Sequence, residues 1–262
     1  MGDDSRYIIG IDLGTTNSAI SYLDTERDDG IRQFPIPQLV NAGEVADEAF
    51  LPSFCYLPGE HELAAGSLEL PWDRRKHHAV GVFARRQGAA VPGRLVGSAK
   101  SWLAHGGVDR TSGILPWGGD LDDAARVSPV TVSSYFLEHI RQAWDHRFGD
   151  ERDESGSRCL MAEQDVVLTV PASFDEAARE LTVQAAREAG LTRLTLLEEP
   201  LAAFYGWLWQ HEAEWKDRIT EHDLVLVIDI GGGDLRFLPR QGRARLHAAA
   251  DSGRRAPSPR GR

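Results

Sequence analysis

Two segments of this chain share one local design, and together they constrain the fold more than any other feature. Each is a short apolar run, then Asp, an apolar residue and a glycine-rich turn: IIGIDLGTTNS at 8–18 and VLVIDIGGGD at 225–234. Glycines let backbone N–H groups approach an anion closely, and an Asp at a strand end can hold hydrated Mg²⁺. One copy alone indicates an ordinary hairpin turn. Two copies that face each other would clamp a nucleotide from both sides.

The pattern between the two turns predicts strands that alternate with helices. The expected strands are 7–12, 17–23, 31–40 (a Pro-interrupted edge strand), 165–170, 194–198 and 223–230. Apolar residues recur every four positions over 130–148, which predicts a helix. Strands that alternate with helices indicate an α/β sheet with parallel pairs. Residues 42–128 show no long amphipathic helix and predict an inserted subdomain.

Helix boundaries are predicted from capping residues. Ser173 and Glu176 fit a capping box at the start of a helix, and Gly190 fits the position just after its end. Pro200 fits the first turn of the next helix. His77 and His78 are interpreted as surface residues, because adjacent side chains point apart and no metal-ligand spacing follows.

Composition excludes several classes of protein. Apolar residues make up 42% of the 262 residues, enough for a buried core. The formal net charge of −11 argues against nucleic-acid binding, which needs a basic surface. Cys55 and Cys159 are too far apart for a zinc site and fit a reducing cytoplasm. The start has no apolar signal region, and the apolar run at 224–228 is too short to span a membrane.

Three stretches resemble the 70-kDa heat-shock (DnaK-type) chaperones. IIGIDLGTTNSAI at 8–20 is similar to their first phosphate motif, and VIDIGGG at 227–233 to the start of their second. Between them, the stretch from DVVLTVPASF to EEPLAAFYG at 165–206 is similar in order and spacing. The resemblance covers about residues 6–235, and the middle section resembles a divergent branch.

This resemblance implies an α/β, actin-like ATPase (ribonuclease H-like) fold: a first lobe and the start of a second, with ATP or ADP and Mg in the cleft between lobes. The expected division is 1–198 for lobe I (core 1–41 and 129–198, insertion 42–128), 199–238 for the start of lobe II and 239–262 for a disordered tail. The tail holds seven Arg and one Asp, a net charge of +6, which leaves −17 for residues 1–238.

The resemblance assigns catalytic roles to Lys100, Glu199 and Asp12. Asp12 would hold magnesium through bound water, Lys100 would contact the γ-phosphate and the attacking water, and Glu199 would organise water and metal. Phosphoryl transfer needs charge neutralisation and an aligned water more than covalent help. Simpler alternatives stay open: a solvated lysine for Lys100, and favourable charge at a helix N-terminus for Glu199.

Further residues are assigned to nucleotide binding and to signalling between domains. Those implied to bind the nucleotide are Gly14, Thr15, Thr16, Asn17, Asp229, Gly231, Gly232 and Gly233, with Asp229 also on magnesium through water. Pro171 and Arg179 match a proline and an arginine that relay nucleotide state to the substrate domain, although a structural turn explains Pro171 equally well. Unfolded clients and co-chaperones are the implied partners of an intact parent protein.

The sequence departs from the family at its second phosphate motif. GGG is followed by Asp234, Leu235 and Arg236, so the family threonine is missing, and the Arg-rich tail begins soon afterwards. A frameshift or a truncated gene near 233–240 explains both features; a short homologue with a basic tail is the alternative. We therefore expect this chain to bind ATP weakly or not at all.

Other classes of function are alternatives to a chaperone ATPase or are disfavoured by the sequence. Sugar kinases and cell-shape filament proteins share the two-turn nucleotide clamp, but the 165–206 stretch favours the chaperones. A non-catalytic interaction fragment, with the tail as a basic contact arm, is a further alternative. A P-loop is disfavoured by Ala99 before Lys100, and dinucleotide binding by a strand after the first turn.

Overall fold

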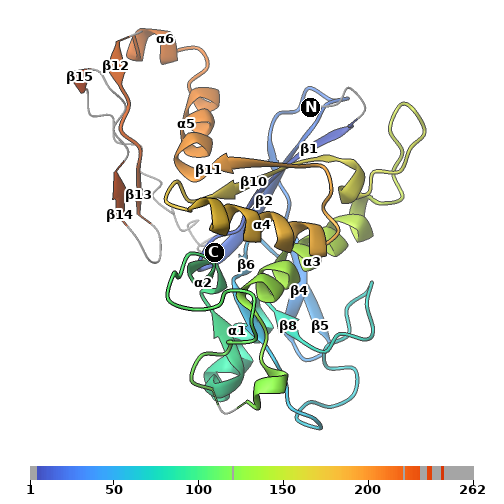
Figure 1. Cartoon of the computed structure of the whole chain (residues 1–262). Helices are drawn as coiled ribbons and strands as arrows, with labels where there is room; N and C mark the ends of the chain where they lie inside the picture. Colours follow the sequence, from blue (N-terminus) through green and yellow to red (C-terminus); the bar gives the residue numbers. More distant parts are fainter. Residues whose placement is uncertain (1–4, 120, 221, 231–234, 238–242, 245–262) are drawn as a thin grey trace, which may run out of the picture. The chain divides into compact units, whose positions relative to one another are not determined.

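The computed structural model describes residues 5–119, 121–220, 222–230, 235–237 and 243–244. The chain divides into two units, Met1–Glu199 and Pro200–Arg262. The first unit holds the largest sheet and the helices that cover it (Figure 1). No helix among the described residues is both long and apolar enough to cross a lipid bilayer.

A six-stranded sheet forms the centre of the first unit (Figure 1). Its strands are β1 (Tyr7–Asp12), β2 (Asn17–Asp24), β3 (Arg32–Gln33), β6 (Leu51–Pro52), β10 (Asp165–Val170) and β11 (Leu194–Glu198). They run in the order β11-β10-β1-β2-β3, with β6 beside β2. β10 is parallel to both β1 and β11, whereas β2 is antiparallel to β1. The predicted α/β sheet with parallel pairs is confirmed.

Two helices, α3 (Pro129–Phe148) and α4 (Glu176–Glu188), pack against each other and against this sheet (Figure 1). Alternate strand residues such as Ile9, Ile11 and Leu168 are inaccessible and join the helices in one apolar core. The pleat sends the intervening residues, among them Asp12 and Thr169, to the opposite face, where they are more exposed. The two faces of the sheet therefore have different tasks.

The helix predicted at 130–148 is α3. Ser128 caps it: the Ser128 hydroxyl accepts from the backbone N–H of Thr131 at 3.0 Å. The four-residue apolar stripe faces the core, and its first four members are buried: Val132, Phe136, Ile140 and Trp144. Trp144 also donates its indole N–H to the carbonyl of Cys159 at 3.0 Å, so this polar atom is satisfied inside the core.

The start of α4 differs from the prediction. Asp175, not Ser173, is the N-cap, and its carboxylate accepts from the N–H of Ala178 at 2.7 Å. The N–H of Phe174 donates to the carbonyl of Pro171 and closes a turn. Ser173 belongs to this turn and therefore lies before the helix. The helix end is as predicted, because Gly190 has φ of 85°, a conformation that glycine adopts without strain.

The edge strand predicted at 31–40 is divided in two. β3 pairs with β2 and lies at the sheet edge, and the N–H of Phe34 still donates to Ile20. Pro35 has no N–H to continue the ladder. β4 (Ile36–Asn41) leaves the sheet and pairs with β5 (Glu44–Glu48) in a separate hairpin.

Short elements fill the segment between β5 and α3. They are β7 (Phe54–Tyr56), β8 (Ala79–Val80), α1 (Val82–Ala90), β9 (Leu95–Gly97), α2 (Ala99–Leu103) and the 3₁₀ turns Pro92–Arg94 and Asp123–Ala125; a third 3₁₀ turn, Met161–Glu163, precedes β10. The longest helix of the described part of this segment has nine residues, so no long helix interrupts it. The strands form a small sheet in the order β8-β7-β9, and a second apolar cluster packs around Tyr56 and Phe83.

The second unit contains short elements only. They are α5 (Glu199–Gln210, which starts at the last residue of the first unit), α6 (Trp215–Arg218), β12 (Asp223–Leu224), β13 (Ile228–Ile230), β14 (Leu235–Phe237) and β15 (Arg243–Ala244). Pro200 is the second residue of α5, as predicted for a first turn. β13 and β14 form an antiparallel hairpin, and β12 pairs with β15.

Two predictions for this unit were wrong in part. The buried strand expected at 223–230 is two short strands, and residues 223–227 are only half-buried. Each piece pairs along just two or three residues, which is too little to hold one continuous strand. Arg243 and Ala244 of the tail form a strand although disorder was predicted; most of the tail lies outside the described residues.

Candidate functional site

The first glycine-rich turn follows β1 directly. Asp12 is the last residue of the strand, and its side chain is exposed. A side-chain carbon on Gly14 would lie 2.1 Å from the carbonyl oxygen of Asn17, so only glycine fits this tight turn. Thr16 and Asn17 are exposed and Thr15 is half-buried. The turn therefore presents a carboxylate and two threonine hydroxyls close to one another in the chain.

The carboxyl ends of three parallel strands meet at this edge of the sheet. In the register, Asp12 lies opposite Thr169, and Val170 lies opposite Glu198. Glu199 follows at the first residue of α5. Because neighbouring strands are about 4.8 Å apart, Asp12 and the end of β11 are separated by roughly 10 Å across the sheet. In open α/β sheets this edge is where ligands bind.

The Asp12 carboxylate has one partner in its own sheet. The hydroxyl of Thr169 donates to Asp12 Oδ1 at 2.8 Å, which orients the carboxylate. No three or more His, Cys, Asp or Glu side chains gather as a metal cage in the described part of the chain. Mg²⁺ keeps most of its waters and needs few protein oxygens, so the exposed Asp12 carboxylate fits this ion.

Lys100 lies on the short helix α2 and is only 8% exposed. Its Nζ forms an ion pair with Glu199 Oε1, across 99 residues of sequence. A charge removed from water needs such a partner, so the pair accounts for a buried ammonium group here. Ser98, two residues before Lys100, has φ of 55°, a strained conformation for a residue other than glycine. Two of the predicted catalytic residues are thus in contact.

Arg179 and Pro171 lie on the helix side of the same strand ends. Arg179 on α4 pairs with Glu198 Oε1 at 2.7 Å. Pro171 is buried directly after β10, and its carbonyl accepts from the N–H of Phe174 at 3.0 Å. The adjacent acids at the end of β11 therefore have different cations: Arg179 for Glu198 and Lys100 for Glu199.

The second glycine-rich turn is described only at its margins. Asp229 lies in β13, where its backbone pairs with that of Arg236. The Asp229 side chain and Gly231, Gly232 and Gly233 lie outside the described residues. That the two turns face each other therefore stays a prediction.

Comparison with known proteins places these features in a family. The family model described as Hsp70 protein matches residues 121–237. Curated relatives include chaperone protein HscA homologs of Cupriavidus necator (31% identical over 242 residues), Pseudomonas putida (32% over 240) and Burkholderia multivorans (31% over 247). These alignments cover 87–89% of this chain and 31–32% of each relative. The chain belongs to the Hsp70 family. The family relationship also gives the fold, an actin-like ATPase fold, with which the mixed α/β sheet agrees.

This Hsp70-family chain spans about a third of the length of the curated relatives that it matches. The family as a whole uses nucleotide and Mg and acts with client and co-chaperone proteins.

Two hydroxyls beside the first glycine-rich turn were not predicted from the sequence. Thr169 reaches Asp12, and the buried Ser53 bonds to the turn itself. Thr169 follows the alternation of β10, which places it on the exposed face of the sheet. The sequence pattern therefore predicts the face of Thr169 but not its contact with Asp12. Nothing local to Ser53 indicates its contact, because its partner is 39 residues away in sequence.

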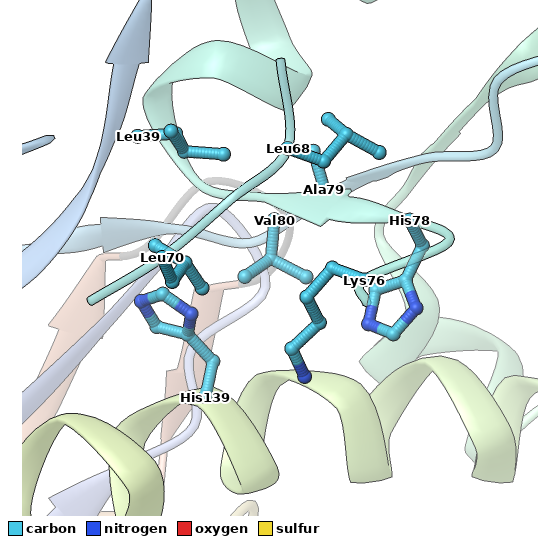
Figure 2. A pocket seen from close by; sticks show the side chains of 8 residues that line it. All are labelled: Leu39, Leu68, Leu70, Lys76, His78, Ala79, Val80 and His139. Atoms are coloured by element: carbon cyan, nitrogen blue, oxygen red, sulfur yellow. The ribbon is translucent and has the colours of Figure 1, made fainter. Parts of the chain in front are cut away.

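The prediction for His78 was wrong in part, because its side chain is half-buried, and His139 nearby is more deeply buried. His78 stacks on Tyr135 with ring centroids 3.6 Å apart, and burial lowers the pKa of His78 to about 3. Figure 2 shows His78, Lys76 and His139 around one small cavity of about 10 Å³, enough for one water at most. His139 is 3% exposed; burial lowers its pKa to about 4, and its Nε2 lies 3.0 Å from the Pro37 carbonyl oxygen. His77 is exposed, as predicted.

Proposed function

We propose that this chain is part of the ATP-binding and ATP-hydrolysing domain of a DnaK-type chaperone. One observation carries the proposal: the strand ends of β1, β10 and β11 gather Asp12 and Glu199 at a single edge of the sheet, with Lys100 paired to Glu199. Two carboxylates and a buried cation beside a tight glycine turn suit a phosphoryl group and its metal.

Each side chain has a distinct task in this proposal. Asp12 would hold hydrated Mg²⁺ through its carboxylate, which Thr169 orients. Lys100 neutralises developing charge on the transferred phosphoryl group, and Glu199 orients the attacking water. The existing ion pair holds Lys100 and Glu199 close together before substrate arrives. Magnesium, when bound, would supply further neutralisation of phosphate charge.

Nucleotide affinity is proposed to be low. The second turn should supply the opposite side of the clamp, but Asp234, Leu235 and Arg236 follow its glycines where the family has a threonine and a second acid. The threonine of the family would supply a hydroxyl donor that this sequence lacks. We therefore expect a dissociation constant for Mg-ATP weaker than micromolar.

Cellular role and location are proposed on the same basis. Cys55 and Cys159 are both buried and free, which fits a reducing cytoplasm. Unfolded clients and co-chaperones would be the partners of the larger protein to which such a domain belongs. Sugar phosphorylation, filament formation and nucleotide-independent partner binding remain the alternatives, and none has a specific observation in its favour.

Titration with Mg-ATP followed by single-turnover hydrolysis tests the proposal. Backbone resonances of Thr15 and Thr16 should shift at millimolar Mg-ATP. Lys100→Met should lower the hydrolysis rate by about a hundredfold to a thousandfold, the usual effect of removing one charge-stabilising group. Lys76→Met is the matched control. The Lys76 side chain is also buried, at 7% exposed, and its Nζ pairs with Glu138 Oε2 at 2.9 Å and not with a residue of the turn.

Two outcomes would contradict different parts of this proposal. No resonance shift and no hydrolysis at millimolar Mg-ATP would refute the ATPase function of this chain. A micromolar dissociation constant would refute low affinity and leave the function in place. Equal rate losses in Lys100→Met and Lys76→Met would remove the specific role of Lys100.

A further inference from the structure

Ser53 connects the Hsp70 phosphate turn to the segment that follows β6. It lies between β6 and β7 and is 2% exposed. The Ser53 hydroxyl donates to the carbonyl oxygen of Gly14 at 2.7 Å, and the Ser53 N–H donates to the carbonyl of Thr16 at 2.9 Å. One buried residue thus binds two carbonyls of a single four-residue turn.

A second buried serine, Ser18, lies beside Ser53. The Ser18 hydroxyl lies 3.1 Å from Ser53 Oγ, and Ser18 is inaccessible. Since Ser53 uses its only hydroxyl proton on Gly14, Ser18 must be the donor of this pair. Ser18 is therefore bonded to Ser53 and not to a carbonyl of the turn.

Because each peptide unit is planar, the bonds to the two carbonyls also fix the directions of the N–H groups in the same units. In a trans peptide the C=O and N–H of one unit point in opposite directions. The Gly14 carbonyl is held toward buried Ser53, so the N–H of Thr15 points away from Ser53. The Thr16 carbonyl is held in the same way, so the N–H of Asn17 also points away from it. Among the described residues the one cis bond is Leu115–Pro116, so both units are trans.

We infer that Ser53 is the positioning residue of the phosphate turn, and that it fixes the backbone N–H groups that meet the phosphates. The inference rests on the proposed nucleotide-binding function and adds a residue to it. Pre-oriented donors are effective because they need no reorganisation when the anion arrives. Without the Ser53 hydroxyl, the peptide between Gly14 and Thr15 can rotate and the Thr15 N–H loses its fixed direction.

Ser53→Ala in the full chain tests this role, with Ser133→Ala as the matched control. Ser133 is also buried, and its hydroxyl donates to the carbonyl of Pro129 at 2.8 Å inside α3. Both changes remove one buried hydroxyl that bonds to a backbone carbonyl, so comparable losses of stability are expected. Only Ser53→Ala should weaken Mg-ATP binding, by about tenfold, and speed hydrogen exchange at the N–H of position 53, which is bonded to the Thr16 carbonyl of the turn.

A second variant separates the direct contact from the surrounding bonds. Ser18→Ala leaves both turn bonds in place, so its Mg-ATP affinity should stay within about twofold of the unaltered chain. Unchanged affinity in Ser53→Ala would overturn the inference, as would equal losses in Ser53→Ala and Ser18→Ala.

Failure of the proposed function has a separate signature. If the unaltered chain shows no response to Mg-ATP, that function fails, and hydrogen exchange alone decides about Ser53. Faster exchange at the N–H of position 53, after correction for the intrinsic rates of Ser and Ala, in Ser53→Ala but not in Ser133→Ala would then support the positioning role. Equal exchange in the two variants would overturn it.

Discussion

α3 and α5 are both helices with tryptophans, yet their surroundings differ completely. Eleven residues of α3 are buried, whereas none of α5 is, although α5 is the more apolar sequence. Trp144 of α3 is inaccessible, and Trp209 of α5 is 51% exposed. α3 lies against the sheet and within a group of aromatic rings that includes Tyr7 and Phe34.

This difference shows that apolar composition does not by itself make a core. Burial requires a second surface of matching shape, and dispersion and hydrophobic gains scale with the area that is covered. The first unit provides that surface through its sheet. Stability should therefore depend on the first unit, and substitutions in the two units should have very different effects.

The largest expected effect is at Trp144. Trp144→Ala should lower the free energy of unfolding by about 3–5 kcal/mol, because it removes a large buried ring and leaves a cavity. Trp209→Ala, at an exposed site, should change it by no more than about 0.5 kcal/mol. Urea unfolding followed by circular dichroism measures both. Similar losses at the two sites would break the contrast between the units.

A slightly smaller effect is expected at Arg6, just before β1. Arg6 pairs with Asp24 at 2.9 Å and with Glu151 at 3.1 Å, and the Arg6 and Asp24 side chains are nearly inaccessible. Arg6→Met would leave the buried Asp24 with only the exposed Arg27, 3.5 Å away, at a cost of about 3 kcal/mol. The exposed pair of Arg158 with Asp150 is the control, and Arg158→Met should cost less than about 1 kcal/mol. Equal losses in the free energy of unfolding would show that burial does not determine how much these ion pairs stabilise the protein.

Acid should destabilise the first unit through His139. Its pKa is lowered by burial to about 4, below the ordinary value near 6.5, so the unfolded chain binds the proton more tightly. Stability therefore falls as pH falls from 6.5 toward 4, by about 2 kcal/mol from this group between pH 7 and 5. In His139→Gln that part of the slope should vanish, as measured by unfolding at several pH values.

His61 provides the comparison for this pH effect. Its side chain is 92% exposed, so His61→Gln should leave the slope as it is. A His139→Gln variant with the full acid sensitivity of the unaltered chain would show that other groups cause it.

The smallest expected effect concerns the start of α4. Asp175→Ala should cost about 1 kcal/mol, because it removes the acceptor of the Ala178 N–H. Ser173→Ala should have little effect, since Ser173 lies outside the helix and is exposed. Thermal unfolding of both variants decides between the cap seen in the structure and the one predicted from sequence.

Much of the first unit could be predicted from the sequence. The alternation in 7–12 and 165–170 and the four-residue stripe of α3 are local patterns, and they gave the strands, the helix and its buried face. The division of the 31–40 strand was not predicted, because the chain leaves the sheet at Pro35 for a partner, β5, that no local pattern identifies. The burial of His78 has the same cause, since its partner Tyr135 belongs to α3.

The sequence by itself determined the family, the glycine at position 14 and the identity of Asp12, Lys100 and Glu199 as candidates, because motifs and periodicity are properties of short stretches. Only the tertiary structure decided that Lys100 contacts Glu199, that Thr169 reaches Asp12 and that Ser53 binds the turn. These contacts depend on strand register and on the packing of distant segments, and a shift of one residue in a strand moves every side chain to the opposite face.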